Sequence, residues 1–338
     1  MTRRVKAAVY GTGSWGTAFG MVLADAGCDV TLWGRRQELV DAVNDGRTNP
    51  DYLPGVELPE NLCATTDPAL AARGADFTVL AVPSQTLRGN LAEWAPLLAP
   101  DTVLVSLMKG IELGTAKRMS EVIDDVTDVG QKRIAVVSGP NLAREIAERQ
   151  PAASVVATGD EELAVKIQEA CHSPYFRPYT NTDLVGAELG GAVKNVITLA
   201  VGIAVGLGFG DNARASVITR GLAETARLGA ALGADPYTLS GLAGLGDLVA
   251  TCSSSLSRNR TFGEKLGRGM SVTEISTGSR QVAEGVMSCE SISDLAGRNG
   301  IDMPIIDHVA RVVRGELIPG DMLGSLLSRS AKPERHGH

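Results

Sequence analysis

Lys194 is a charged residue in an otherwise apolar stretch of the 338-residue chain. In GAELGGAVKNVITLA, the other residues are apolar or small apart from Glu188 and Asn195. Burial disfavours the charged form of a lysine, which suits such a side chain to proton transfer. Lys194 is therefore a candidate acid/base, and the alternative is a lysine at the helix rim that packs its stem and reaches water.

Asp247 is a single acid in an apolar, glycine-rich segment, GLAGLGDLVATC. A carboxylate in such surroundings needs a cation or hydrogen-bond donor nearby, and Lys194 could be that partner. The run Ser257, Arg258, Asn259 and Arg260 follows, with hydroxyl, guanidinium and amide donors that suit a phosphate. The alternative for this serine-rich run is a plain loop without a ligand.

Two further polar segments directly follow predicted strands. Lys109 comes after the apolar run 102–107. The run 134–138 ends at Ser138 and is followed by Gly139, Pro140 and Asn141. Ligands of parallel sheets bind at the carboxyl ends of the strands, so both loops could face one ligand. By position alone, Lys109 could equally be a solvated surface lysine.

Three glycines in GTGSWG stand between the first predicted strand and the first predicted helix. Gly11 permits a tight turn, Gly13 lets the backbone approach a pyrophosphate, and Gly16 allows close packing of helix on strand. This context predicts a dinucleotide site rather than a purely structural turn. The second glycine-rich segment, GLGFG at 206–210, follows a helical run and is expected to be a helix break.

The adenosine ribose of the cofactor is normally bound by a side chain at the end of the second strand, about 20 residues beyond the glycines. The sequence there is TLWGRR, with Arg35 and Arg36 where an NAD-selective fold usually has an acid. A guanidinium suits a 2′-phosphate, so the sequence predicts NADP. NAD use stays open, since one arginine could lie against the adenine or face solvent.

The first half of the chain alternates short apolar runs with helical patterns. Continuous apolar runs indicate parallel strands covered on both faces, and hence a doubly wound sheet. Strands are predicted at 5–10, 29–33, 77–82, 102–107, 134–138 and 154–158, and helices up to residue 26, through residue 43 and at 160–172. Proline and glycine at 46–59 predict a long surface loop, and 173–178 is interpreted as a turn-rich link.

The second half shows almost only helical periodicity. Helices are predicted at 186–204, 215–232, 261–269 and 306–317. The fold class is thus an α/β Rossmann domain with a mostly parallel sheet, followed by an all-α domain. The expected division is 1–180 for the dinucleotide domain, 181–330 for the helical substrate domain and 331–338 for a polar tail.

The charge and composition of the chain argue against several classes of function. A net charge of −7 leaves no diffuse basic surface for nucleic acid or anionic lipid. Five scattered cysteines and the lack of a secretory signal predict free thiols in a cytoplasmic protein without a metal site. The apolar segment 196–209 is shorter than a membrane span and is expected to be a buried helix. Apolar helices make a homodimer plausible.

The motifs GTGSWGTA, VPSQ, SLMKGIE, SGPN, GAELGGAVKNV, GLAGLGDL and SRNR occur in this order. The chain thereby resembles the bacterial NAD(P)-dependent glycerol-3-phosphate dehydrogenase family from about Val5 to Leu327. The resemblance implies reversible reduction of dihydroxyacetone phosphate to sn-glycerol 3-phosphate, the backbone of phospholipids, without a metal. It makes Lys194 the general acid/base, counts Lys109 and Asp247 with it as catalytic residues, and implies that Lys109 and Arg258 bind and polarise the anionic substrate.

The family's binding residues carry over position by position. The implied substrate contacts are Lys109, Gly139, Asn141, Lys194, Asp247, Ser257, Arg258 and Asn259. The implied cofactor contacts, beside the three glycines, are Ser14, Trp15, Arg35, Arg36, Lys109, Ala143, Arg258, Val282 and Glu284. Asn141 departs from the serine that the family most often has there, which leaves its detailed contact open, although an amide can still hydrogen-bond.

Two other functions remain as alternatives. A 3-hydroxyacid or 6-phosphogluconate type dehydrogenase also joins a Rossmann unit to a helical domain with a lysine. A non-catalytic NADPH-binding redox sensor is the alternative from another class. Substrate-dependent oxidation of NADPH separates a sensor from an enzyme, and the choice of substrate separates the two dehydrogenases.

Overall fold

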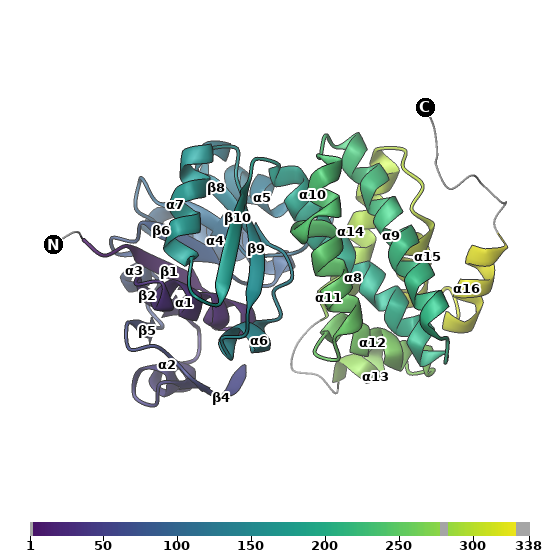
Figure 1. The fold of residues 1–338 in the computed structure, drawn as a ribbon, viewed down its shortest axis with the longest axis horizontal. Coiled ribbons are helices and arrows are strands. Elements are labelled where there is room, and N and C mark those ends of the chain that lie inside the picture. Colours follow the sequence, from purple (N-terminus) through teal and green to yellow (C-terminus); the bar gives the residue numbers. More distant parts are fainter. Residues whose placement is uncertain (1–2, 278–282, 329–338) are drawn as a thin grey trace.

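A computed structural model describes residues 3–277 and 283–328. Val282 and the tail 331–338 therefore lie outside the described residues. The first half forms a sheet flanked by helices, and the second half is a group of helices beside it (Figure 1). This arrangement confirms the predicted fold class.

The large sheet has eight strands in the order β10-β9-β8-β7-β6-β1-β2-β5. Every neighbouring pair is parallel except β8 and β9, so the sheet is mostly parallel. A separate antiparallel hairpin pairs β3 with β4. The strands are β1 (Lys6–Tyr10), β2 (Asp29–Trp33), β3 (Thr48–Asn49), β4 (Leu53–Glu57), β5 (Leu62–Thr65), β6 (Phe77–Leu80), β7 (Val103–Ser106), β8 (Ile134–Ser138), β9 (Ala152–Ala157) and β10 (Phe176–Asn181).

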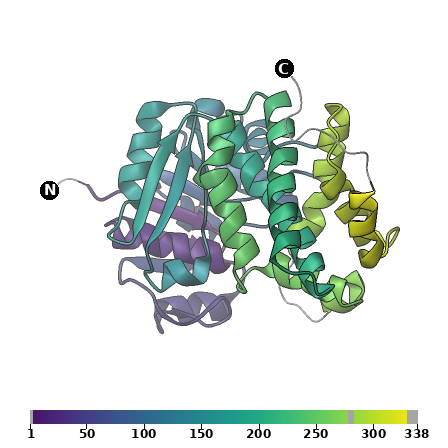
Figure 2. The same cartoon turned by 45° about the vertical axis from the view of Figure 1, so that its right-hand side comes forward.

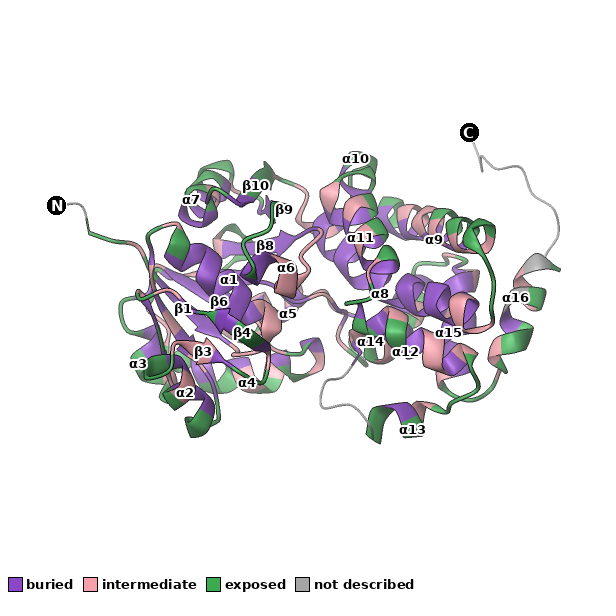
Figure 3. Cartoon of the chain, turned by 60° about the horizontal axis from the view of Figure 1, so that its bottom comes forward, coloured by how far each residue is buried: buried purple, intermediate pink, exposed green. Residues whose placement is uncertain are grey.

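Helices cover both faces of this sheet, as continuous apolar strands require. Figure 3 shows buried residues along β1, β6 and β8. The helices of this half are α1 (Ser14–Asp25), α2 (Gln37–Asn44), α3 (Pro68–Ala72), α4 (Leu87–Trp94), α5 (Met119–Thr127), α6 (Ala143–Ala147) and α7 (Glu161–Cys171). The strands and helices predicted from apolar runs in this half are thus present, with ends that shift by a few residues.

Two predictions for this half are wrong. The segment 46–59 is not a long surface loop, because it contains the β3–β4 hairpin and buries Asn49, Leu53 and Val56. The link 173–178 contains the start of β10, which pairs in parallel with β9. Pro178 suggested a turn, but β10 is an edge strand, where the missing N–H of proline is tolerated. The edge strand β5 had not been predicted at all.

The second half is built around α8 (Leu184–Gly206), which packs against α9, α11, α12 and α14. Figure 2 shows these helices beside the sheet. The segment 206–210 separates α8 from α9, as predicted, with Gly208 at a φ of +84°. The other helices are α9 (Asp211–Ala231), α10 (Pro236–Ser240), α11 (Asp247–Ser253), α12 (Arg258–Gly267), α13 (Val272–Thr277), α14 (Glu284–Arg298), α15 (Pro304–Val313) and α16 (Pro319–Leu327).

Glycines let α8 and α12 come into close backbone contact. A methyl group on Gly202 would lie 2.2 Å from the carbonyl oxygen of Arg260, and one on Gly263 would lie 2.2 Å from that of Leu199. Side chains larger than hydrogen would force the helices apart. This seam fixes the start of α12 relative to Lys194 on α8.

The buried character of α8 was predicted, but the length argument was wrong. The helix has 23 residues, and its most apolar stretch of 18 residues has a mean hydropathy of 1.6, so it is long and apolar enough to cross a membrane. In the structure, 89% of its most apolar window is buried inside the protein. Its composition therefore reflects a core helix of the second half.

Candidate active site

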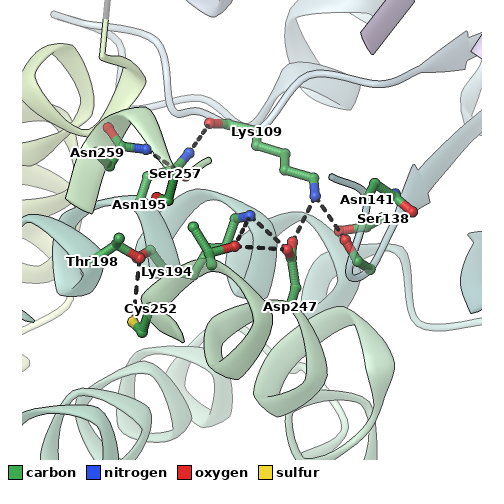
Figure 4. Close-up of polar contacts among 12 residues, drawn as sticks. Lys109, Ser138, Asn141, Lys194, Asn195, Thr198, Asp247, Cys252, Ser257 and Asn259 are labelled. Atoms are coloured by element: carbon green, nitrogen blue, oxygen red, sulfur yellow. Dashed lines mark hydrogen bonds and ion pairs between the residues drawn. The ribbon is translucent and has the colours of Figure 1, made fainter. Parts of the chain in front are cut away.

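One carboxylate joins two lysines where the two halves of the molecule meet (Figure 4). Asp247, at the start of α11, is 1% exposed. Its Oδ1 lies 2.6 Å from Nζ of Lys194 on α8, and its Oδ2 lies 2.6 Å from Nζ of Lys109, which follows β7. The predicted pairing of Lys194 with Asp247 is present. Lys194 is buried rather than at a helix rim, and Lys109 is not a solvated surface residue.

A π-helical turn, Leu242–Gly246, directs Asp247 towards α8. A methyl group on Gly190 of α8 would lie 2.4 Å from the carbonyl oxygen of Ala243, and one on Gly244 would lie 1.9 Å from that of Leu239. Only glycine fits at either position without displacing the backbone. The glycines of GAELGG and GLAGLG thus let the turn approach α8 closely enough for the ion pair.

Thr251 completes the environment of Lys194. Nζ of Lys194 donates to Oγ1 of Thr251 at 2.8 Å, and this hydroxyl lies 3.2 Å from Oδ1 of Asp247. Sequence reasoning missed Thr251. Its position four residues after Asp247, on the same face of α11, was the available signal.

Lys109 also contacts the loop after β8. Its ammonium donates to the carbonyl oxygen of Gly139 at 2.9 Å. Gly139 has a φ of +134°, a backbone conformation that favours glycine. Burial lowers the pKa of Lys109 to about 8, and the nearby charge of Lys194 acts in the same direction, although Asp247 opposes both. Lys109 therefore changes charge within an experimentally accessible pH range.

The same loop presents polar atoms without partners. Nδ2 of Asn141 donates to Oγ of Ser154 at 3.2 Å. Within the described parts of the chain, Oδ1 of Asn141 and Oγ of Ser138 are buried and have no hydrogen-bond partner. Figure 4 shows both residues next to the end of the Lys109 side chain. Buried polar atoms without partners are costly, so they suit a polar ligand at this position.

Two asparagines connect the Lys109 loop to the helical half. Nδ2 of Asn195 donates to the carbonyl oxygen of Lys109 at 3.1 Å, and Nδ2 of Asn259 donates to Oδ1 of Asn195 at 2.9 Å. The backbone N–H of Gly285 in turn donates to Oδ1 of Asn259 at 3.0 Å. This chain of amides links β7, α8, α12 and α14. Both amide atoms of Asn259 thus already contact protein, although each can make a second hydrogen bond.

The SRNR run forms the start of α12. Ser257 is the N-cap, and its hydroxyl accepts from the backbone N–H of Arg260 at 3.3 Å. Arg258 is the first helical residue, and burial lowers the pKa of its guanidinium, while Glu284 and Tyr52 act in the opposite direction. Arg260 donates to the carbonyl oxygen of Ser253 instead. Of the two arginines, Arg258 is therefore the one placed next to the predicted cofactor residue Glu284.

The glycine turn has the geometry that a pyrophosphate requires. Gly11 has a φ of +127°, and a methyl group on it would lie 2.4 Å from the carbonyl oxygen of Ala81. A methyl group on Gly16 would lie 2.2 Å from the carbonyl oxygen of Gly11, whereas one on Gly13 would meet no atom within 4 Å. Helix α1 begins at Ser14, so its first N–H groups open into this space. The residues present fit a dinucleotide.

The other predicted cofactor residues lie on several elements. Arg36 forms an ion pair with Asp51, and Arg35 is exposed. Nε1 of Trp15 is buried and lacks a partner within the described residues. Ala143 begins α6, and Glu284 accepts a hydrogen bond of 2.8 Å from Ser84 of the VPSQ motif.

Comparisons with known proteins match the chain to one enzyme family. The family model for the N-terminus of NAD-dependent glycerol-3-phosphate dehydrogenase matches residues 6–164, and the model for its C-terminus matches residues 183–324. The chain is 74% identical over 335 residues to glycerol-3-phosphate dehydrogenase (NAD(P)+) of Streptomyces avermitilis, covering 99% of this chain and 100% of that protein. It is 72% identical to the protein of the same name from Streptomyces coelicolor, with the same coverage.

A solved structure shows the same likeness. The crystal structure of glycerol-3-phosphate dehydrogenase from Coxiella burnetii is 38% identical in sequence and superposes with a TM-score of 0.92, covering 96% of this chain and 99% of that one. Both family models match their respective halves of the chain, and the fold agrees over nearly its whole length. The chain therefore belongs to the NAD(P)-dependent glycerol-3-phosphate dehydrogenase family.

Proposed function

We propose that the protein catalyses the reversible NAD(P)H-dependent reduction of dihydroxyacetone phosphate to sn-glycerol 3-phosphate. The observation that carries this proposal is the buried Asp247 that holds Lys194 and Lys109 at 2.6 Å each. Two ammonium groups around one carboxylate leave a net positive site, which suits an oxygen that gains negative charge. The names of the close relatives support the same reaction.

A nicotinamide cofactor bound at the Gly11–Gly16 turn would supply the hydride that reduces the carbonyl carbon of the substrate. Nζ of Lys194 donates a proton to the carbonyl oxygen and accepts it again in the reverse direction. Lys109 polarises the same oxygen, and Asp247 keeps both ammonium groups in place. The proposed substrate contacts beside these three residues are Gly139, Asn141, Ser257, Arg258 and Asn259.

Arg258 is the proposed ligand of the substrate phosphate. It stands at the N-terminus of a ten-residue helix, where the helix dipole also favours an anion. The glycine seam between α8 and α12 supports this role, since it sets the distance from Lys194 to the start of α12. Gly202 and Gly263 are its central residues.

Several broader properties belong to the same proposal. We expect NADP as the preferred cofactor because of Arg35 and Arg36, with NAD also accepted. The chain would act as a cytoplasmic homodimer in the supply of phospholipid precursors. It would divide into a dinucleotide domain, 1–180, and a helical substrate domain, 181–330.

A steady-state assay tests the reaction directly. We expect purified protein to oxidise NADPH when dihydroxyacetone phosphate is added, and to reduce NADP⁺ with sn-glycerol 3-phosphate. 6-Phosphogluconate and simple 3-hydroxyacids should support no turnover with the oxidised cofactor, since the site would bind a three-carbon phosphate. Turnover with 6-phosphogluconate but not with sn-glycerol 3-phosphate would refute the proposal, and a lack of any substrate-dependent NADPH oxidation would favour the sensor.

Activity should also depend on the charge of Lys109. Because the pKa of Lys109 is lowered to about 8, we expect kcat/KM for dihydroxyacetone phosphate to fall as pH rises above about 8. In the Lys109→Arg variant, which stays charged, the remaining activity should lose this fall. A fall at the same pH in both proteins would assign the titration to another group.

The lowered pKa of Lys109 also determines how the free energy of unfolding changes with pH. The folded protein holds the Lys109 proton less tightly than the unfolded chain, whose lysine has the ordinary pKa of 10.5. Between pH 8 and 10.5, the unfolded chain therefore binds more protons, so this group makes folding more favourable as pH rises. Below pH 8, the full cost of burying the charged ammonium is present.

A further inference from the structure

The β3–β4 hairpin is attached to the glycine turn on both sides of Asp51. Nδ2 of Asn49, which is fully buried, donates to the carbonyl oxygen of Thr12 at 3.0 Å and to Oγ1 of Thr17 at 2.8 Å. The hydroxyl of Ser14 donates to the carbonyl oxygen of Tyr52 at 3.2 Å. The hairpin is thus held against the turn that fits a pyrophosphate, although the sequence suggested no chemistry for it.

Asp51 projects from this hairpin to Arg36. Its Oδ2 lies 2.6 Å from Nη1 of Arg36, and the guanidinium also lies 5.8 Å from the ring centre of Tyr52. The side chains of Arg36 and Asp51 are 48% and 38% exposed. Both groups are therefore accessible to a ligand.

This ion pair lies next to the glycine turn. A methyl group on Gly34 would lie 2.7 Å from Cγ2 of Thr12, so the end of β2 touches the turn directly. In this fold an acidic side chain at the end of β2 normally accepts a hydrogen bond from the ribose 2′-hydroxyl of NAD. Here Arg35 and Arg36 occupy that part of the chain, and a carboxylate reaches it from the hairpin instead.

We propose that Arg36 and Asp51 together recognise the group at the ribose 2′ position. Arg36 binds the 2′-phosphate of NADP, and Asp51 accepts a hydrogen bond from the 2′-hydroxyl of NAD. This inference rests on the proposed function, because it assumes that the dinucleotide lies on the Gly11–Gly16 turn. It assigns Asp51 as a residue that sets cofactor specificity and explains how one site accepts both cofactors.

The physical chemistry of an exposed ion pair makes this exchange possible. Such a pair contributes little net stability in water, so an incoming phosphate can replace Asp51 as the partner of Arg36. A phosphate also offers the guanidinium two parallel hydrogen bonds. Asp51 then repels the phosphate, whereas it favours the hydroxyl. Removing its charge should shift specificity towards NADP.

Adenine nucleotide fragments isolate this effect from catalysis. We would measure their dissociation constants by calorimetry, without substrate, for the full-length protein and for Asp51→Asn. The probes are adenosine 2′,5′-bisphosphate, ADP and 2′-deoxy-ADP, which present a phosphate, a hydroxyl and a hydrogen at the 2′ position. Asp45→Asn is the matched control, because Asp45 is an exposed acid at the end of α2 that has no contact with Arg36.

In the unchanged protein and in Asp45→Asn, ADP should bind about tenfold more tightly than 2′-deoxy-ADP, the worth of a hydrogen bond to a charged group. In Asp51→Asn this difference should shrink to about twofold or less, and adenosine 2′,5′-bisphosphate should bind about threefold more tightly. Unchanged ratios in Asp51→Asn would refute the role of Asp51.

The Arg36→Ala variant separates this inference from the proposed function. If adenosine 2′,5′-bisphosphate binds and Arg36→Ala weakens it, the predicted cofactor site holds, and the response of Asp51→Asn alone decides the inference. If Arg36→Ala leaves the binding of all three fragments unchanged, the 2′ position lies elsewhere and the inference fails. The steady-state assay with dihydroxyacetone phosphate would then still test the proposed reaction independently of this inference.

Discussion

The Lys194→Ala variant should reduce kcat for dihydroxyacetone phosphate reduction about 10³-fold, within the range for loss of a general acid. The loss should appear in kcat because Lys194 acts on the reacting oxygen, whereas the predicted dinucleotide turn begins with Gly11 and Gly13 on another part of the molecule. NADPH binding, measured by calorimetry, should therefore change little. Stopped-flow hydride transfer under single-turnover conditions would show that the chemical step itself is slow.

Lys166→Ala is the matched control for this experiment. Lys166 is an exposed lysine on α7, so its removal should leave kcat unchanged. The fold of Lys194→Ala should persist, because Asp247 keeps its second partner, Lys109, at 2.6 Å. A folded Lys194→Ala protein with near-normal kcat would show that another group transfers the proton.

Asp247→Asn should lower both activity and stability. The variant keeps the shape of the side chain but leaves two buried ammonium groups without their shared counter-ion. Breaking a buried ion pair in this way costs about 3 to 5 kcal/mol. We expect urea unfolding to show a loss of this size and kcat to fall at least about 100-fold, as the proton donor loses its position.

The pH dependence distinguishes loss of charge from loss of structure. Without the carboxylate, which opposes the lowering of the Lys109 pKa, Lys109 should lose its proton more readily, so the free energy of unfolding of Asp247→Asn should recover relative to the unchanged protein as pH rises from 7 to 10. Asp247→Glu retains the charge and should keep part of the stability. Asp101→Asn, which alters an exposed carboxylate before β7, should change neither property. A pH-independent loss in Asp247→Asn would indicate a purely structural role.

The sequence predicts those parts of the protein that depend on local pattern. Continuous apolar runs identify most strands of the large sheet because such strands are buried on both faces. The ion pair between Lys194 and Asp247 was also predictable, since each residue is a single charge in an apolar segment and requires a partner. This prediction requires no closeness in sequence, and the two residues are 53 positions apart.

Other features depend on tertiary contacts that no local pattern reports. Pro54 and Gly55 suggested a loop, yet the hairpin is ordered by the contacts of the buried Asn49 with the glycine turn. The second lysine on Asp247 was not predicted as its partner, because Lys109 comes from a loop in the other half of the chain. The amide link from Lys109 through Asn195 to Asn259 likewise joins segments that lie far apart in the sequence.

The order of the helices along the chain has a consequence for biosynthesis. Helix α8 is mostly apolar, yet the helices that cover it, α9, α11, α12 and α14, all follow it in the sequence. At ribosomal rates of about 5 to 20 residues per second, the roughly 90 residues up to the end of α14 take about 5 to 18 seconds to be made. During this interval the nascent chain carries a 23-residue, mostly apolar helix that has not yet packed against these four helices. The burial of α8 is therefore completed only after α14 has been made.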